Sequence, residues 1–160
     1  MGRLNVLLVD DDRNLVTTLS YGLRKALGEA SSVAVCFSGA EALSMIATQE
    51  FDVVVSDFNM PGLSGLEFLS RIRQDHPDMI LVLVTAFGTD ALEEGVHQLG
   101  GGYIHKPFEP SFLVQSIKGL IQGKETMGKT EHVSRVMEEL GKPAGSSANI
   151  RLESTDSASS

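Results

Sequence analysis

Apolar residues in this chain gather in five short runs, and between the runs they recur at helical spacing. The runs are rich in β-branched residues, continuous rather than alternating, and only a few residues long. This pattern is typical of strands covered on both faces of a parallel sheet. The runs lie at residues 6–9, 33–37, 53–55, 80–84 and 103–105.

The stretches between the runs predict amphipathic helices, because their apolar residues return every three or four positions. The five apolar faces are Leu15, Leu19, Leu23 and Leu27; Ala42, Leu43, Ile46 and Ala47; Leu66, Leu69 and Ile72; Leu92, Gly95, Val96 and Leu99; and Leu113, Ile117, Leu120 and Ile121. Gly28 follows the first helix where a C-terminal cap belongs. The glycine run at 100–102 predicts a loose entry to the last strand.

Alternating strands and helices over residues 1–123 predict a single α/β domain of parallel βα units joined by right-handed crossovers. Five helices cannot all cover one face of a twisted open sheet. The expected fold is therefore a flavodoxin-like, doubly wound five-stranded parallel sheet with strand order 2-1-3-4-5.

Residues 124–160 form a polar tail with a different pattern. Val133, Val136, Met137 and Leu140 recur at helical spacing and predict one further helix over residues 130–140. The remainder is rich in small polar residues, which predicts disorder. The tail is too short and too polar for a winged-helix or helix-turn-helix domain. The chain is therefore expected to act by binding a partner protein, unless it is the N-terminal part of a longer one.

Composition narrows the class of protein further. With 42% apolar residues among 160, the chain has a globular composition, and its formal net charge of −8 argues against direct nucleic-acid binding. No apolar run approaches the length of a membrane helix, and the single cysteine, Cys36, excludes an intramolecular disulfide. We expect a cytoplasmic protein without membrane contact.

Carboxylates follow two strands that flank the point where the predicted strand order reverses. Asp10, Asp11 and Asp12 follow the first strand, and Asp57 ends the third. Ligands bind at such a switch point, and crowded carboxylates require a counter-cation, for which Mg²⁺ is the best suited. The alternative is that these aspartates only cap the first helix and a loop.

A hydroxyl and an ammonium group reach the same edge of the sheet. Thr85 ends the fourth strand and Lys106 follows the fifth. Together with a metal they predict a site for phosphoryl transfer, which requires positioning and charge stabilisation. The nucleophile is then a carboxylate, because no Ser-His-Asp or Cys-His arrangement is present.

The motifs LLVDDD at 7–12, DFNMPGLSG at 57–65, VTA at 84–86 and GYIHKPF at 102–108 resemble the receiver domain of bacterial two-component response regulators. The resemblance covers roughly residues 3–122, with all motifs in order. It implies that Asp57 accepts a phosphoryl group from a phosphohistidine on a sensor histidine kinase or a histidine phosphotransfer protein.

The same resemblance implies the roles of the neighbouring residues. Asp10, Asp11, Asp57 and the backbone carbonyl of Asn59 would form the Mg²⁺ site, with Asp11 and Asp57 as direct ligands. Asp12 stands where the family often carries Glu.

Three further positions concern the phosphoryl group and the response to it. Thr85 and Lys106 would contact the phosphoryl group, and Tyr103 matches the aromatic switch residue whose ring turns inward as the Thr85 hydroxyl moves. The alternative for Tyr103 is a surface aromatic with a buried body and a wet tip. The Lys106–Pro107 peptide bond is expected to be cis.

Two positions are expected to tune the rate of self-dephosphorylation. Asn59 lies two residues after Asp57, and Phe87 lies two residues after Thr85, where its apolar bulk would slow the approach of water. The alternative is that Phe87 points away from the site and only packs on helix 4.

The resulting hypothesis is a phosphoacceptor that switches a partner-binding face near helix 4, strand 5 and helix 5 and turns over no external substrate. A downstream effector protein, or a second copy in a homodimer, would bind this face. Rival hypotheses are a Mg²⁺-dependent phosphohydrolase, a flavin-binding electron carrier and a receiver that is never phosphorylated. Asn59 argues against the first, the carboxylates against the second, and the complete site against the third.

Overall fold

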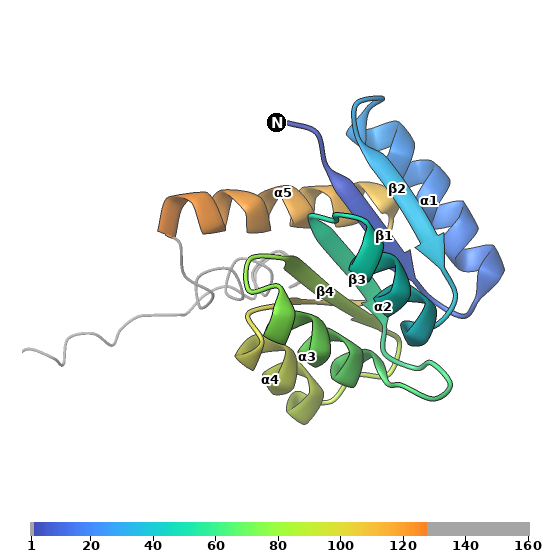
Figure 1. Ribbon diagram of the computed structural model, residues 1–160, viewed down its shortest axis with the longest axis vertical. Coiled ribbons are helices and arrows are strands. Elements are labelled where there is room, and N and C mark those ends of the chain that lie inside the picture. The colour runs from blue at the N-terminus through green and yellow to red at the C-terminus, as the bar shows by residue number, and fades with distance from the viewer. Residues whose placement is uncertain (1, 128–160) are drawn as a thin grey trace, which may run out of the picture.

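The fold is a five-stranded parallel sheet with helices on both faces, seen in a computed structural model that describes residues 2–127, the side chains of 124–127 excepted (Figure 1). The strand order is β2-β1-β3-β4-β5, which confirms the predicted order. The strands are β1 (Asn5–Val9), β2 (Ser32–Cys36), β3 (Val53–Asp57), β4 (Ile80–Thr85) and β5 (Gly102–His105). The helices are α1 (Arg13–Leu27), α2 (Gly39–Thr48), α3 (Gly65–Asp75), α4 (Asp90–Gln98) and α5 (Pro110–Met127).

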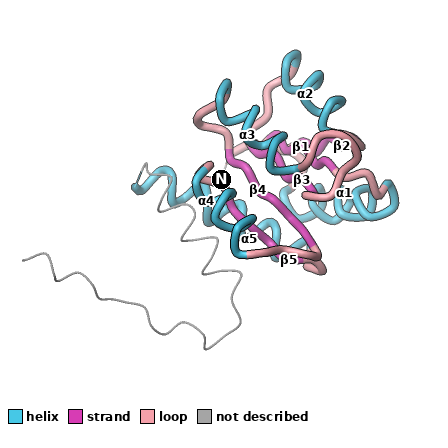
Figure 2. Tube along the Cα trace, turned by 90° about the horizontal axis from the view of Figure 1, so that it is seen from below, coloured by secondary structure: helices cyan, strands magenta, loops and turns pink. Residues whose placement is uncertain are grey.

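Two buried clusters sandwich the sheet, because successive strand residues point to opposite faces. In β1, Val6 and Leu8 pack with α1 and α5, whereas Leu7 and Val9 pack with α2, α3 and α4. Figure 2 shows α2 and α3 on one side of the strands and α1 on the other. Each strand is buried on both sides, which explains why its apolar run is continuous.

Short polar side chains cap the helices that follow the first four strands. Asp12, Ser38, Ser64 and Thr89 each accept a hydrogen bond from the backbone N–H three residues on, at the start of α1, α2, α3 and α4 respectively. These bonds satisfy backbone donors that a helix N-terminus leaves open. Gly28 ends α1 with φ of 94°, as the sequence predicted.

The buried side of α1 differs from the predicted leucine face. Val16, Ser20 and Leu23 are buried, whereas Leu15 is 39% exposed. The inclusion of Leu15 in the buried face was therefore wrong. Val16 and Leu23 pack in the buried cluster against the sheet, and Leu15, one position before Val16, lies at the rim of that face.

The glycines before β5 form a hydrogen-bonded turn and not a loose entry. Gly100 has φ of 71° and donates its N–H to the His97 carbonyl, and Gly101 donates to the Val96 carbonyl. A left-handed glycine that closes a helix in this way is a common C-terminal cap. The turn therefore anchors β5 to the end of α4.

Helix α5 continues to Met127, beyond the boundary at residue 123 that the sequence suggested. The predicted helix over 130–140 and the rest of the tail lie outside the described residues. Among the residues that the structure describes, none of the helices combines the length and apolar character needed to span a bilayer.

Candidate functional site

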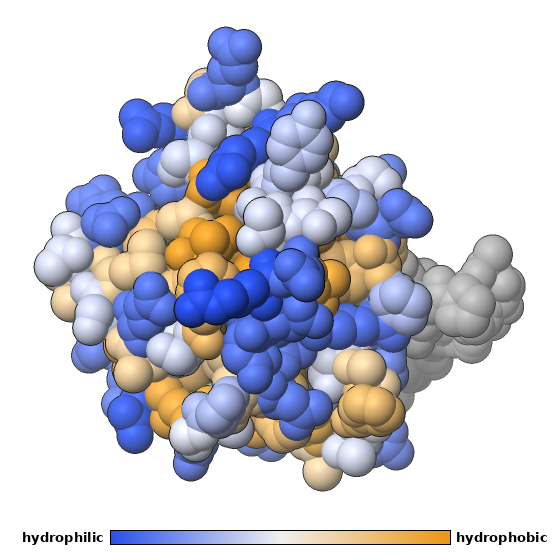
Figure 3. Space-filling model, turned by 90° about the vertical axis from the view of Figure 1, so that its right-hand side faces the viewer, coloured by the Kyte–Doolittle hydropathy of each residue, from blue (hydrophilic) through white to orange (hydrophobic). Residues whose placement is uncertain are grey.

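The register of the sheet brings the predicted acidic residues together. Val9 pairs with Ser56 across β1 and β3, and Asp57 pairs with Val84 across β3 and β4. Asp10 and Asp57 therefore leave adjacent strands at the same level, at the carboxyl edge of the sheet. Seen from that side, hydrophilic groups gather at the centre of the molecule with apolar groups around them (Figure 3).

Three carboxylates form an anionic bowl at this edge. Asp10, Asp11 and Asp57 each place a carboxylate oxygen within 4.8 Å of the others. Asp57 is 5% exposed and Asp10 7% exposed, whereas Asp11 is open to solvent. Their closeness confirms the predicted convergence, and hard oxygen donors with one open side suit Mg²⁺, which keeps several water ligands.

Lys106 ties the two buried carboxylates together. Its Nζ donates to Asp57 Oδ1 at 2.6 Å and to Asp10 Oδ2 at 3.0 Å. The Lys106 backbone N–H bonds to the Thr85 carbonyl, and the peptide bond to Pro107 is cis, as predicted. The ammonium group is thus held where it faces both acids.

Burial and charge act in opposite directions on Asp57. Burial raises the pKa of Asp57, and so does the nearby Asp10 carboxylate, while the hydrogen bond and charge of Lys106 lower it. For Lys106, burial lowers the pKa, but its bonds to the two carboxylates outweigh burial and the net shift is upward. Lys106 is therefore a firmly charged ammonium, and its charge offsets part of the burial cost at Asp57.

The capping interpretation holds for one aspartate of the first group. Asp12 Oδ1 accepts the Leu15 N–H at 3.1 Å and so caps α1. Asp10 Oδ1 accepts the Asp12 N–H at 3.0 Å, which leaves Oδ2 for Lys106. Capping and the acidic site coexist, because Asp12 caps the helix while Asp10 and Asp11 contribute to the acidic cluster.

Thr85 and Phe87 lie at the end of β4, beside the bowl. Thr85 is wholly buried, and its Oγ1 accepts the Phe87 N–H at 3.1 Å. The Phe87 side chain is 77% exposed, so it does not pack on α4 to any great extent. Asn59 is also exposed, in the loop between β3 and α3.

Tyr103 points inward from β5. It is 8% exposed, belongs to the buried cluster that contains Leu92 and Val96, and meets the His105 ring edge to face at 5.4 Å. Burial raises the pKa of Tyr103, with a smaller contribution from Glu93. The ring is therefore a core element in this structure.

The steric role of one residue next to Asp57 escaped the sequence reasoning. A Cβ at Gly65 would overlap the Asp57 carbonyl oxygen and lie 2.8 Å from Leu83 Cδ1. The Gly65 N–H bonds to the Phe58 carbonyl, so the start of α3 lies directly against the end of β3. Its position eight residues after Asp57 was the available signal, but the need for a missing side chain is visible only in three dimensions.

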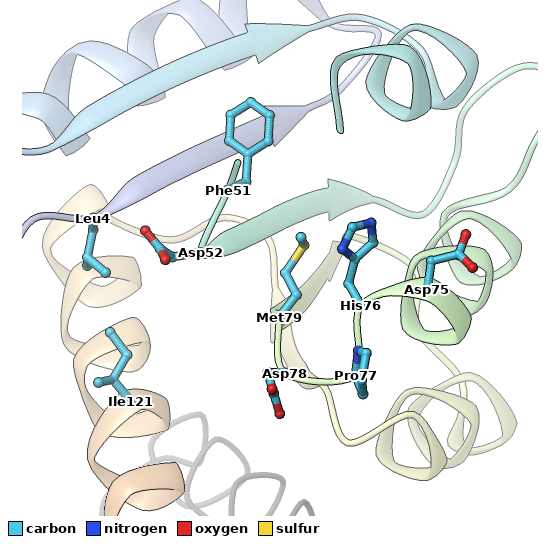
Figure 4. Close-up of a pocket in the computed structure, with 9 residues that line it drawn as sticks. All are labelled: Leu4, Phe51, Asp52, Asp75, His76, Pro77, Asp78, Met79 and Ile121. Carbon is cyan, nitrogen blue, oxygen red and sulfur yellow. The ribbon is translucent and has the colours of Figure 1, made fainter. Parts of the chain in front are cut away.

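A hollow of about 480 Å³ opens at the other edge of the sheet, where the strands begin. Its lining includes Asp52, His76 and Met79, together with Ile121 of α5 (Figure 4). Asp10, Asp11, Asp57 and Lys106 do not line it, so this hollow has no part in the acidic site.

Comparison with known proteins identifies the class. The family described as "Response regulator receiver domain" matches residues 6–118. The chain belongs to this family, a module of two-component phosphorelay signalling that is phosphorylated on an aspartate.

Individual relatives agree with this assignment. The chain is 37% identical to the response regulator protein FleR of Pseudomonas aeruginosa, in an alignment that covers 95% of this chain and 33% of FleR. It is 36% identical to the DNA-binding transcriptional regulator NtrC of Escherichia coli, in an alignment that covers 68% of this chain and 23% of NtrC. The chain thus spans about a quarter to a third of these two proteins.

Solved structures show the same architecture. The chemotaxis response regulator CheY4 of Vibrio cholerae is 28% identical, with a TM-score of 0.65 over 73% of this chain and 98% of that one. A CheY-like receiver domain protein from Methanospirillum hungatei is 25% identical, with a TM-score of 0.71 over 78% of this chain and 98% of that one.

Proposed function

We propose that Asp57 is the phosphoacceptor of this receiver and that the donor is a phosphohistidine on a sensor histidine kinase or a histidine phosphotransfer protein. The observation that carries the proposal is the ion pair of Lys106 with Asp57 and Asp10, beside the carboxylate of Asp11. In this arrangement a buried carboxylate is held as an anion. The ammonium beside it can move its hydrogen bond to an oxygen of the transferred phosphoryl group.

The proposed metal site consists of Asp10, Asp11 and Asp57 with the backbone carbonyl of Asn59. The clustered carboxylate oxygens fit Mg²⁺ in donor type and spacing. When bound, Mg²⁺ supplies positive charge that balances the acidic residues and the oxygens of the incoming phosphoryl group. A transition metal with a preference for nitrogen or sulfur would find no such ligand in this cluster.

Transfer to Asp57 breaks the P–N bond of the phosphohistidine and forms a P–O bond with a carboxylate oxygen. Lys106 shifts its ammonium from the carboxylate oxygen to a phosphoryl oxygen and thereby stabilises the developing charge. The Thr85 hydroxyl oxygen accepts the Phe87 N–H and keeps its own proton, which it donates to the phosphoryl group. Water later cleaves the acyl phosphate, at a rate tuned by Asn59 and Phe87, and no external substrate is turned over.

The output is proposed to pass through the face made by α4, β5 and α5, where Thr85 and Tyr103 link the site to a downstream effector or a second copy of the chain. Several relatives are named as transcriptional regulators, so we propose a transcriptional output, with the acidic receiver itself contacting no nucleic acid. The proposed location is the cytoplasm. The receiver domain is proposed to extend through α5 to Met127, slightly beyond the boundary at residue 123 that the sequence suggested, with the following residues as a tail.

The proposal is tested by incubating the chain with Mg²⁺ and acetyl phosphate and mapping the adduct by mass spectrometry. A single phosphoryl group on Asp57 is expected, absent from Asp57→Asn and greatly slowed in Lys106→Met. Asp12→Asn is the matched control, because asparagine also caps a helix and the ammonium of Lys106 bonds to Asp10 and Asp57, not to Asp12. An adduct on another residue, or equal labelling of Asp57→Asn, would contradict the proposal.

A further inference from the structure

Gly88 lies in the loop between β4 and α4, and the space for its missing side chain is filled by Tyr103. A Cβ at Gly88 would overlap the Tyr103 phenolic oxygen and lie 2.7 Å from Cζ, with His105 Cε1 at 3.5 Å. Gly88 is not among the glycines of positive φ, so its backbone suits any residue. What this position requires is the absence of a side chain.

We propose that Gly88 is a positioning residue: its missing side chain forms the recess that holds the Tyr103 phenol inward. The residue at position 88 then decides which form of the face between α4 and β5 this protein presents. The link to signalling rests on the proposed function, whereas the steric coupling of Gly88 and Tyr103 does not.

The loop around Gly88 is attached at both ends, so a new side chain would displace the ring and not the backbone. On one side, the Phe87 N–H bonds to Thr85 Oγ1 at 3.1 Å, and Thr85 is wholly buried. On the other, Thr89 caps α4 through the Leu92 N–H at 3.1 Å. Tyr103, by contrast, stands on the edge strand β5 and can turn outward by rotation about its side-chain bonds.

An outward ring would change what the face offers to a partner. The phenol would leave Leu92 and Val96 and move to the surface of α4, which carries Asp90 and Glu93. An aromatic group would then be added to a surface that carries these two carboxylates. Gly88 thus selects the form in which the ring is withdrawn from that surface.

The ring position is measured by ¹⁹F NMR of the full chain labelled with 3-fluorotyrosine. The chain has two tyrosines, and Tyr21, 71% exposed, serves as the internal reference for a solvated ring. In Gly88→Ala the Tyr103 resonance is expected to move to the solvated range. Gly95→Ala is the control, since its Cβ meets Leu66 Cδ2 at 3.0 Å, so it strains helix packing without touching Tyr103. An unmoved Tyr103 resonance in Gly88→Ala would overturn the proposal.

A stability cycle tests the same contact from the other side. Gly88→Ala should lower the urea midpoint when Tyr103 is present and leave it equal or higher in a Tyr103→Ala background, where alanine only restricts the unfolded chain. If Gly88→Ala alone does not fold, restored folding in the double variant supports the proposal. A penalty that persists without the ring refutes it. Both readouts omit Mg²⁺ and phosphodonor, so they stand even if Asp57 is not the acceptor.

Discussion

At the scale of single residues, the charge balance of the site is set by Lys106. Its ammonium bonds to Asp57 and Asp10, while Asp11 stands nearby without that bond. One cation among three carboxylates leaves the bowl negative, and like charges at this distance repel. The residual charge favours the binding of a divalent cation and opposes the approach of an anionic phosphoryl group.

Phe87 offers a prediction at the same scale. Replacing this exposed ring by glutamate puts a group that can orient water beside the acyl phosphate, so the lifetime of phosphorylated Asp57 should shorten about tenfold, or about 1.4 kcal/mol in the barrier. This lifetime is measured by following the loss of phosphorylated protein after acetyl phosphate has been removed.

The controls for this prediction are apolar and distant substitutions. Phe87→Leu should keep the lifetime of the parent chain, and Tyr21→Glu, which also puts a carboxylate in place of an exposed aromatic, should have no effect because α1 carries it away from the loop. Equal lifetimes in Phe87→Glu and the parent would show that Phe87 does not shield the site.

At the scale of elements, Arg73 of α3 fastens three segments together. Its guanidinium donates to the backbone carbonyls of Leu99 at 2.8 Å, Pro77 at 2.7 Å and Met79 at 2.9 Å. The end of α4 and the loop before β4 are thereby joined to the end of α3. Burial lowers the pKa of Arg73 and Asp78 partly opposes this, but a guanidinium stays charged at neutral pH.

Replacing Arg73 by lysine should lower the free energy of unfolding by about 2 kcal/mol, because the single ammonium nitrogen cannot replace both the Nε bond to Leu99 and the Nη1 bonds to Pro77 and Met79. Urea denaturation followed by circular dichroism measures the change. Arg71→Lys, an exposed position on the same helix, should leave the free energy of unfolding within about 0.5 kcal/mol of the parent. Equal stability of the two variants would show that the Arg73 bonds contribute nothing. Phosphorylation at the opposite edge of the sheet should continue in both.

At the scale of the whole molecule, the acidic site links metal binding to stability. A cation that binds only the folded chain stabilises it by RT ln(1 + [L]/Kd), about 2.7 kcal/mol at a hundred times Kd. Saturating Mg²⁺ should therefore raise the melting temperature, and a chelator should reverse the rise. Asp11→Asn should raise the melting temperature without Mg²⁺, because a repulsive charge is lost, and should remove most of the Mg²⁺ effect.

Asp12→Asn is the control for this experiment as well, since it keeps the cap and leaves the bowl intact. It should respond to Mg²⁺ as the parent does. An undiminished Mg²⁺ effect in Asp11→Asn would show that the metal stabilises the chain from another place.

The sequence by itself determined the architecture and the membership of the acidic site. Continuous β-branched runs and helical periodicity are local properties, and the rules of parallel sheets turn them into one strand order. The carboxyl ends of those strands then bring Asp10, Asp57 and Lys106 to one edge, as the ion pair confirms.

Only the tertiary structure decided which side chains need space and which are buried. Leu15 lies at a rim while its neighbour Val16 is buried. At Gly65 and Gly88 a side chain would overlap neighbouring atoms, so these positions require glycine. The hydrogen bond from Arg73 of α3 to the Leu99 carbonyl at the end of α4 likewise joins residues that are remote in sequence. The periodicity of apolar residues predicts which face of a helix or strand is apolar. The orientation of each helix on the sheet, and the distance between atoms remote in sequence, follow from how the layers pack.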